Sequence, residues 1–211
     1  MTAHLTEEEQ VEALKKWWKE NGKAAVAGVV LGLGGILGWQ AWTQHQQTTA
    51  EQASAQFQQL LMAVRTGAGD SVIKQGELLI SRFEDSTYAV FAALAMARQY
   101  LEQGDSVSAR GRLAWALANS DDPSVQQIAR LRLARLMLNE GDLEGAARLA
   151  DEAPADNFAG EFAQLRGDIA MAGNDRESAR GYYREALAKE VGNADLVRMK
   201  LDDLAVPAGT P

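Results

Sequence analysis

The chain has no cysteine, only two histidines and fewer basic than acidic residues. Without cysteine it can form no disulfide, thiolate nucleophile or Cys-ligated zinc site, and the absence is compatible with an oxidising compartment such as a bacterial periplasm. The formal net charge of −8 argues against a nucleic-acid partner, because phosphate binding requires a basic face. We therefore interpret the arginines between positions 130 and 135 as an ordinary helix surface.

The sequence also lacks the residue groupings of an enzyme. Neither His4 nor His45 has a second His or Cys at metal-ligand spacing, and no Ser/His/Asp set can be assembled. The acidic pairs Asp121-Asp122 and Asp202-Asp203 lie near predicted helix ends, where capping or solvated roles are usual. We predict no catalytic activity, no cofactor and no metal site.

One long uncharged run is present, from Ala24 to Trp42, and Gln40 is its single polar side chain. About 18 or more apolar residues suffice for a helix to cross a bilayer, and no other segment approaches that length. Tryptophans lie at both ends of the run, as expected for the two membrane–water interfaces. The sequence predicts a transmembrane helix over residues 24–43.

Basic residues flank only one end of this span, and the first one after it is Arg65. Lysine and arginine near a span stay cytoplasmic. The sequence thus predicts a cytoplasmic amphipathic arm over residues 1–23 and a periplasmic domain over residues 44–211 of a bacterial inner-membrane protein. The lysines before the span are Lys15, Lys16, Lys19 and Lys23.

A cleaved signal peptide is the alternative to this anchor. Ala53-Ser54-Ala55 has the small-x-small form of a cleavage site, but it lies well beyond the apolar run. The leader would also contain five glutamates, unlike a simple basic n-region. We therefore expect the anchor to be retained.

Beyond the span, apolar residues recur every three or four positions, as in Phe91-Leu94-Ala97-Leu101 and Ile128-Leu131-Ala134-Leu138. This spacing predicts helices. Short turns follow at Gly104-Asp105, Gly141-Asp142 and Gly173-Asn174. Connections this short join antiparallel helices into hairpins.

The hairpins form a repeat. Ala109, Ala146 and Ala179 mark equivalent positions 37 and 33 residues apart, close to the tetratricopeptide period of about 34. The second unit departs from the pattern, with Ala150 where a large side chain is usual. Residues 51–64 and 71–83 predict an N-terminal helix pair, and 194–204 a capping helix. The predicted fold is all-α, a single N-terminal transmembrane helix followed by a tetratricopeptide-like helical-repeat solenoid.

In such arrays the first helix of each hairpin lines a concave groove, which we predict as the partner-binding surface. The alternative is that its apolar residues belong to the core, since a helical apolar stripe usually does. The predicted groove residues are Phe91, Leu94, Arg98 and Leu101 from the first unit, Ile128, Leu131, Arg135 and Leu138 from the second, and Glu161, Gln164, Asp168 and Met171 from the third.

The N-terminal arm and the span have features of their own. Thr6-x-x-Glu9 predicts a helix N-terminal capping box, and Asn21-Gly22 predicts a left-handed C-cap at which the arm bends. The arm could dock on a cytoplasmic partner or only position the span. Gly28, Gly32 and Gly35 share one face that would allow close helix packing, although glycine is common in membrane helices for other reasons.

The first 42 residues carry the most specific pattern. Glu9-Gln10-Val11-Glu12-Ala13, Trp17-Trp18, Glu20-Asn21-Gly22-Lys23 and Gly38-Trp39-x-x-Trp42 resemble the YfgM family of bacterial inner-membrane proteins. The similarity continues through Leu131-Arg132-Leu133-Ala134-Arg135 and covers essentially the whole chain.

This resemblance implies an ancillary subunit of the SecYEG translocon with a periplasmic tetratricopeptide-like domain. It further implies association with the membrane-anchored periplasmic chaperone PpiD and a role in passing newly exported chains to periplasmic chaperones. The residues themselves also allow a second function, a scaffold or regulator that binds one defined envelope partner in signalling or assembly. A dedicated groove should carry fixed charges, and a groove for many unfolded segments should be apolar and tolerant.

Overall fold

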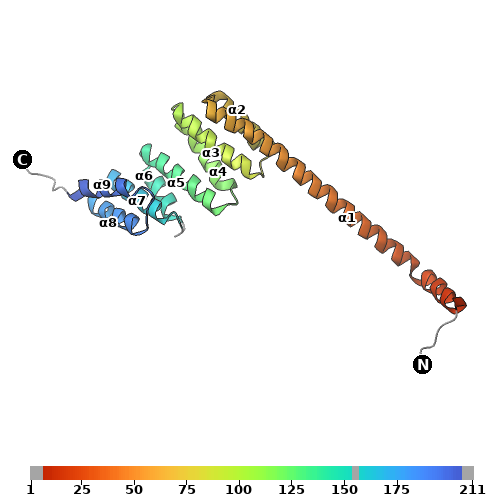
Figure 1. The fold of residues 1–211 in the computed structure, drawn as a ribbon. Coiled ribbons are helices and arrows are strands. Elements are labelled where there is room, and N and C mark those ends of the chain that lie inside the picture. Colours follow the sequence, from red (N-terminus) through yellow and green to blue (C-terminus); the bar gives the residue numbers. More distant parts are fainter. Residues whose placement is uncertain (1–6, 154–156, 206–211) are drawn as a thin grey trace, which may run out of the picture. The chain divides into compact units, whose positions relative to one another are not determined.

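The computed structural model describes residues 7–153 and 157–205, and every regular element within them is an α-helix (Figure 1). His4, Thr6 and the side chain of Glu9 lie outside the described residues. The helices are α1 (Glu7–Thr66), α2 (Gly69–Arg82), α3 (Thr87–Glu102), α4 (Ser106–Asn119), α5 (Pro123–Asn139), α6 (Leu143–Asp151), α7 (Ala159–Ala172), α8 (Arg176–Ala188) and α9 (Ala194–Ala205).

The chain divides into two units, one ending at Gln52 and one beginning at Ala53. The described part of the first unit is the N-terminal portion of α1. Among the described residues, α1 is the one helix long and apolar enough to cross a membrane, and its apolar side chains there are exposed, with Leu31 at 76%. The predicted boundaries at residues 23/24 and 43/44 both lie inside this continuous helix.

The bend predicted at Asn21-Gly22 is wrong, because α1 continues through both residues without a left-handed position. The Asn21 side chain instead donates a hydrogen bond to the Trp17 carbonyl, one turn earlier, at 3.3 Å. Gly22 is buried beneath the Trp18 indole, where a Cβ atom would lie 3.3 Å from the ring. Contacts within one helical turn thus satisfy these residues inside the helix.

In the second unit, α3/α4, α5/α6 and α7/α8 are three antiparallel hairpins with the same turn. A residue with positive φ ends the first helix of each, and the aspartate after it begins the second. The positive φ angles are 78° at Gly104, 83° at Gly141 and 61° at Asn174. Glycine and asparagine tolerate this left-handed conformation, so the predicted turn signals are confirmed.

Each of these aspartates caps the helix that follows. Its carboxylate accepts a hydrogen bond from a backbone N–H three residues later, a group that the helix itself leaves without a partner. These hydrogen bonds lower the pKa of all three carboxyl groups. For Asp105 and Asp175 the main cause is the hydrogen bonding of Ser108 and Ser178, and for Asp142 it is the hydrogen bond from the Gly145 N–H. The pairs are Asp105 with Ser108 at 3.0 Å, Asp142 with Gly145 at 2.9 Å and Asp175 with Ser178 at 3.0 Å.

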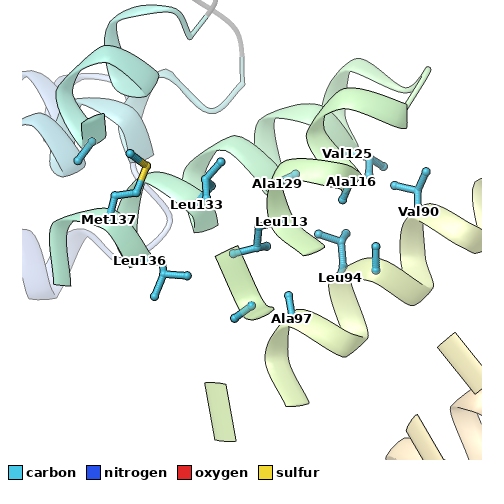
Figure 2. Packing of buried hydrophobic residues seen from close by; sticks show 13 residues of the cluster. Val90, Leu94, Ala97, Leu113, Ala116, Val125, Ala129, Leu133, Leu136 and Met137 are labelled. Carbon is cyan, nitrogen blue, oxygen red and sulfur yellow. The ribbon is translucent and has the colours of Figure 1, made fainter. Parts of the chain in front are cut away.

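Successive hairpins stack in chain order and bury a core between each neighbouring pair (Figure 1). Figure 2 shows the largest cluster, where α3 and α4 pack against α5. The marker residues Ala109, Ala146 and Ala179 are fully buried, which confirms the predicted repeat register. Small Ala150 packs in a cluster with Phe162 of the next hairpin, so α7 supplies bulk that the second unit lacks.

The C-terminal helix α9 covers the last hairpin, as the sequence predicts. Val197 and Leu204 of α9 are buried against α8. Two arginines of α8 donate hydrogen bonds to carbonyls at the end of α9, Arg176 to Asp203 at 3.3 Å and Arg180 to Leu204 at 2.6 Å. These guanidinium groups satisfy carbonyls that have no partner within α9.

Candidate partner groove

Two adjoining cavities lie on the repeat domain, the compact unit that begins at Ala53, and residues of α3 and α5 line both of them. The first has a volume of about 350 Å³ and lies between α3 and α5, with Leu101, Leu113 and Leu136 among its walls. The second, of about 310 Å³, extends from α3 to the end of α1, where Phe57 and Val64 line it. The cavities share the side chains of Leu94, Arg98 and Arg132, so we treat them as one groove and call it the partner groove.

The floor of the groove is apolar, and part of it is also core. Leu94 is 9% exposed and belongs to the cluster of Figure 2, together with Ala97, Leu113 and Leu136. Phe91 and Leu101 are more accessible, at 38% and 44%. Large apolar side chains exposed in a concave surface are typical of a binding site for another polypeptide.

Among the residues that the structure describes, three arginines are the only charged groups that line the first cavity. Arg98 forms an exposed pair with Glu102, one turn along α3, at 2.9 Å. Over the described residues, Arg132 and Arg135 have neither a hydrogen bond nor an ion pair. Other arginines of the domain, such as Arg110 with Glu140 and Asp142, are paired with carboxylates.

Of the residues predicted for the groove, five line it: Phe91, Leu94, Arg98, Leu101 and Arg135. Three residues predicted from the second hairpin, Ile128, Leu131 and Leu138, do not line the groove. Leu131 is 6% exposed and packs against Phe162 of α7, and Ile128 and Leu138 pack onto core clusters. We assign these three to the core, because Leu131 and Leu138 pack in the cluster with Phe162 of the third hairpin and Ile128 packs against the cluster of the first two hairpins.

The predicted residues of the third unit lie elsewhere. Asp168 and Met171 border a separate cavity of about 330 Å³ beside α8 and α9. Asp168 accepts hydrogen bonds from the Tyr183 hydroxyl at 2.7 Å and from Lys200 of α9 at 2.6 Å. Burial, followed by this hydrogen bond and the negative charge of Asp168, raises the pKa of Tyr183. The network links α7, α8 and α9.

The other two third-unit positions also differ from the prediction. Gln164 is 4% exposed, and its Oε1 has no hydrogen-bond partner among the described groups. The Glu161 carboxylate accepts a hydrogen bond from the Gly192 N–H at 3.2 Å, in the turn before α9. Both residues therefore lie at contacts internal to the C-terminal end.

Sequence reasoning missed two contributions to the groove. The end of α1 supplies one wall, and the signal for it is the helical spacing of Phe57, Leu60, Leu61 and Val64. Arg132 was interpreted with its neighbours as an ordinary helix surface, but it borders both cavities. Its position one residue after the core residue Leu131 indicates another face of α5, although spacing alone does not say what that face meets.

The glycines of the predicted membrane helix face open space. A Cβ atom added at Gly28, Gly32 or Gly35 would meet no atom within 4 Å. Elsewhere in the described residues, no group of three or more His, Cys, Asp or Glu side chains could hold a metal ion. Asp122 caps α5 through a 2.8 Å hydrogen bond from the Ser124 N–H, as expected for an acidic residue at a helix end.

Comparison with known proteins gives consistent matches along the chain. A family model described as a tetratricopeptide repeat-like domain matches residues 15–206. Three bacterial relatives are each named ancillary SecYEG translocon subunit. The Escherichia coli K12 protein is 30% identical over 208 residues, covering 98% of this chain and all of the relative. The Haemophilus influenzae protein is 32% identical and the Neisseria gonorrhoeae protein 29%, each covering 97% of this chain and all of the relative.

Proposed function

Because the chain belongs to the tetratricopeptide repeat-like family of ancillary SecYEG translocon subunits, we propose that it acts at the Sec translocon as a membrane-anchored, non-catalytic adaptor. The apolar part of α1 is the anchor, and the partner groove is the surface that holds another polypeptide. The observation that carries this proposal is the concave, largely apolar groove of α1, α3 and α5 on a full-length match to translocon subunits.

The finer part of the proposal concerns the task of the groove. We infer that it helps to pass newly exported proteins to periplasmic chaperones, in company with the membrane-anchored chaperone PpiD. Accessible Phe91 and Leu101 suit brief contacts with apolar segments of many chains. A second candidate is a scaffold for one defined envelope partner, and the unpaired Arg132 and Arg135 favour it, because fixed charges select among partners.

Photo-crosslinking in intact membranes separates these two functions. A photoreactive residue in place of Leu101 should capture several exported polypeptides together with PpiD if the protein is an adaptor. Val107, which is 80% exposed and lines neither cavity, provides the matched control position. Capture of one folded partner would replace the adaptor with the scaffold, and equal capture from both positions would remove the groove from the proposal.

The topology that this function requires is an N-terminal arm in the cytoplasm and a repeat domain in the periplasm. The lysines before the span support it. Because the chain has no cysteine, single cysteines can report on each side without further changes. A membrane-impermeant maleimide should label Val107→Cys in intact spheroplasts and Leu14→Cys only after lysis. The reverse pattern would place the groove on the wrong side of the membrane for exported chains.

We further propose that Gly28, Gly32 and Gly35 form the face on which α1 packs against a helix of the translocon. A leucine at any of the three would prevent close approach of two helix backbones. Gly32→Leu should therefore reduce co-purification of SecYEG in mild detergent. Gly34→Leu is the control, since Gly34 also meets open space but points about 100° away from Gly35 on the helix. Equal co-purification of both variants would contradict a glycine interface.

A further inference from the structure

We propose that the partner groove selects segments that combine large apolar side chains with carboxylates, and that Arg132 and Arg135 recognise those carboxylates. This inference rests on the proposed function, because it names the chemistry of the polypeptide held in the same groove. It begins from the sign of the charges. Beyond the span the chain has 17 basic and 24 acidic residues, yet the charged lining of the first cavity is entirely basic.

The pairing of the arginines strengthens the argument. Three arginines outside the groove pair with carboxylates within the domain: Arg112 with Glu77, Arg130 with Glu152 and Arg166 with Asp151. Arg132 and Arg135 have no such partner among the described residues. A guanidinium group offers five N–H donors in a planar arrangement that matches a carboxylate, so these two are available to an acidic ligand.

The apolar floor next to the arginines sets the second requirement. Leu94, Leu101 and Leu136 line the same cavity as both arginines. When a ligand places leucine-sized side chains on this floor, the adjacent residues of the ligand lie close to the guanidinium groups of Arg132 and Arg135. There, carboxylates would form charge-assisted hydrogen bonds, whereas lysines would face like charges.

Arg98 contributes in a different way. It borders both cavities but is paired with Glu102, whose side chain also lines the second cavity. The second cavity, lined by Arg98, Arg132 and Glu102, is therefore less positive than the first, and the positive charge is concentrated at the α3–α5 end. The acidic residues of a bound segment should lie at that end, with its apolar residues extending toward Phe57 and Val64 of α1.

Binding of synthetic peptides to the full-length protein in detergent tests this inference. The probes are three peptides of one length with leucines at the same positions, separated by glutamates, glutamines or lysines. At low ionic strength the glutamate peptide should bind at least about tenfold more tightly than the lysine peptide, with the glutamine peptide between them. Added salt should reduce this difference, because exposed charges are screened.

Substitutions locate the effect. The double variant Arg132→Gln with Arg135→Gln should lose the preference for glutamate, while the corresponding double lysine variant should keep most of it, because the charges remain. Arg184→Gln is the control, since Arg184 of α8 is exposed, has no ion pair among the described residues and lines neither cavity. Circular dichroism of each variant should match the parent, because none of these side chains is buried.

Four outcomes decide the matter. Preference for glutamate that is lost in the glutamine variant supports the inference. Equal binding of all three peptides overturns the charge requirement but leaves the groove as a binding surface. No binding of any peptide overturns both. Preference for glutamate without any capture of translocon subunits or exported chains in membranes would retain the inference and remove the proposed function.

Discussion

The two ends of the repeat domain use equivalent positions in opposite ways. By the repeat spacing, Arg98, Arg135 and Asp168 occupy one position in three successive units. In the first two units this position borders an open groove. In the third it is an acid that accepts hydrogen bonds from Tyr183 and Lys200 and links three helices.

The neighbours of this position explain the difference. The third unit has large Tyr183 where the second has Ala150, and the α9 ammonium of Lys200 lies 5.8 Å from the centre of the Tyr183 ring. The last apolar face of a stacked array must be covered, so the third unit is used for closure. Repeat equivalence therefore predicts the position of a side chain on its helix, but not its role.

The largest expected effect separates core from groove. Leu131→Asp should place an unpaired charge in the cluster around Phe162 and reduce the free energy of unfolding by about 3–5 kcal/mol. Leu101→Asp lies at an exposed position and should change it by less than about 1 kcal/mol. Urea denaturation followed by circular dichroism measures both. Similar losses would mean that the groove residue is also core.

A glycine of the third unit provides the next comparison. A Cβ atom at Gly167 would lie 2.4 Å from Cε1 of Tyr183, whereas one at Gly111 of α4 would meet nothing within 4 Å. Gly167→Ala should therefore destabilise the protein by about 1–3 kcal/mol through overpacking. Gly111→Ala should stabilise it by up to about 1 kcal/mol, because alanine favours helices. Thermal melts with the same sign for both variants would contradict the close packing.

Removing one hydroxyl tests the network that closes the third unit. Tyr183→Phe deletes the 2.7 Å hydrogen bond to Asp168 and should cost about 0.5–1.5 kcal/mol. Tyr182→Phe is the control, because the Tyr182 hydroxyl makes no hydrogen bond within the described residues. The raised pKa of Tyr183 predicts that its phenol ionises above the usual range of a tyrosine, about 10, in a spectrophotometric titration. Ionisation of Tyr183 within that usual range would argue against the contact.

The smallest effect is shared by all three repeats. The pKa values of Asp105, Asp142 and Asp175 are lower in the folded chain than in an unfolded chain, where they are about 4. Their contribution to stability is thus present above about pH 4 and is lost as the pH falls through the folded values. Asp105→Asn keeps a capping side chain but removes the titrating carboxyl group. The free energy of unfolding of this variant should therefore fall less steeply than that of the parent protein between about pH 5 and 3. Asp121→Asn should follow the parent, because Asp121 is exposed and caps no helix.

Much of the architecture followed from the sequence because its causes are local. Turn residues such as Gly104 and Gly141 define the hairpins through their own backbone preferences, and the uncharged run defines the membrane helix by its length. The family resemblance was likewise recognisable from short motifs in the first 42 residues, and the full-length matches confirm it. The continuity of the helix at Asn21-Gly22 could not be predicted from these two residues alone. Contacts with Trp17 and Trp18 accommodate both residues inside the helix.

The tertiary structure alone decided which faces of the helices became groove and which became core. Leu94 and Leu131 are equivalent by spacing, but α7 covers Leu131, while Leu94 remains at the floor of two cavities. The participation of the α1 end and of Arg132 also depended on which helices became neighbours. Helical periodicity determines which residues share a face, whereas the stacking of hairpins distant in sequence determines what that face contacts.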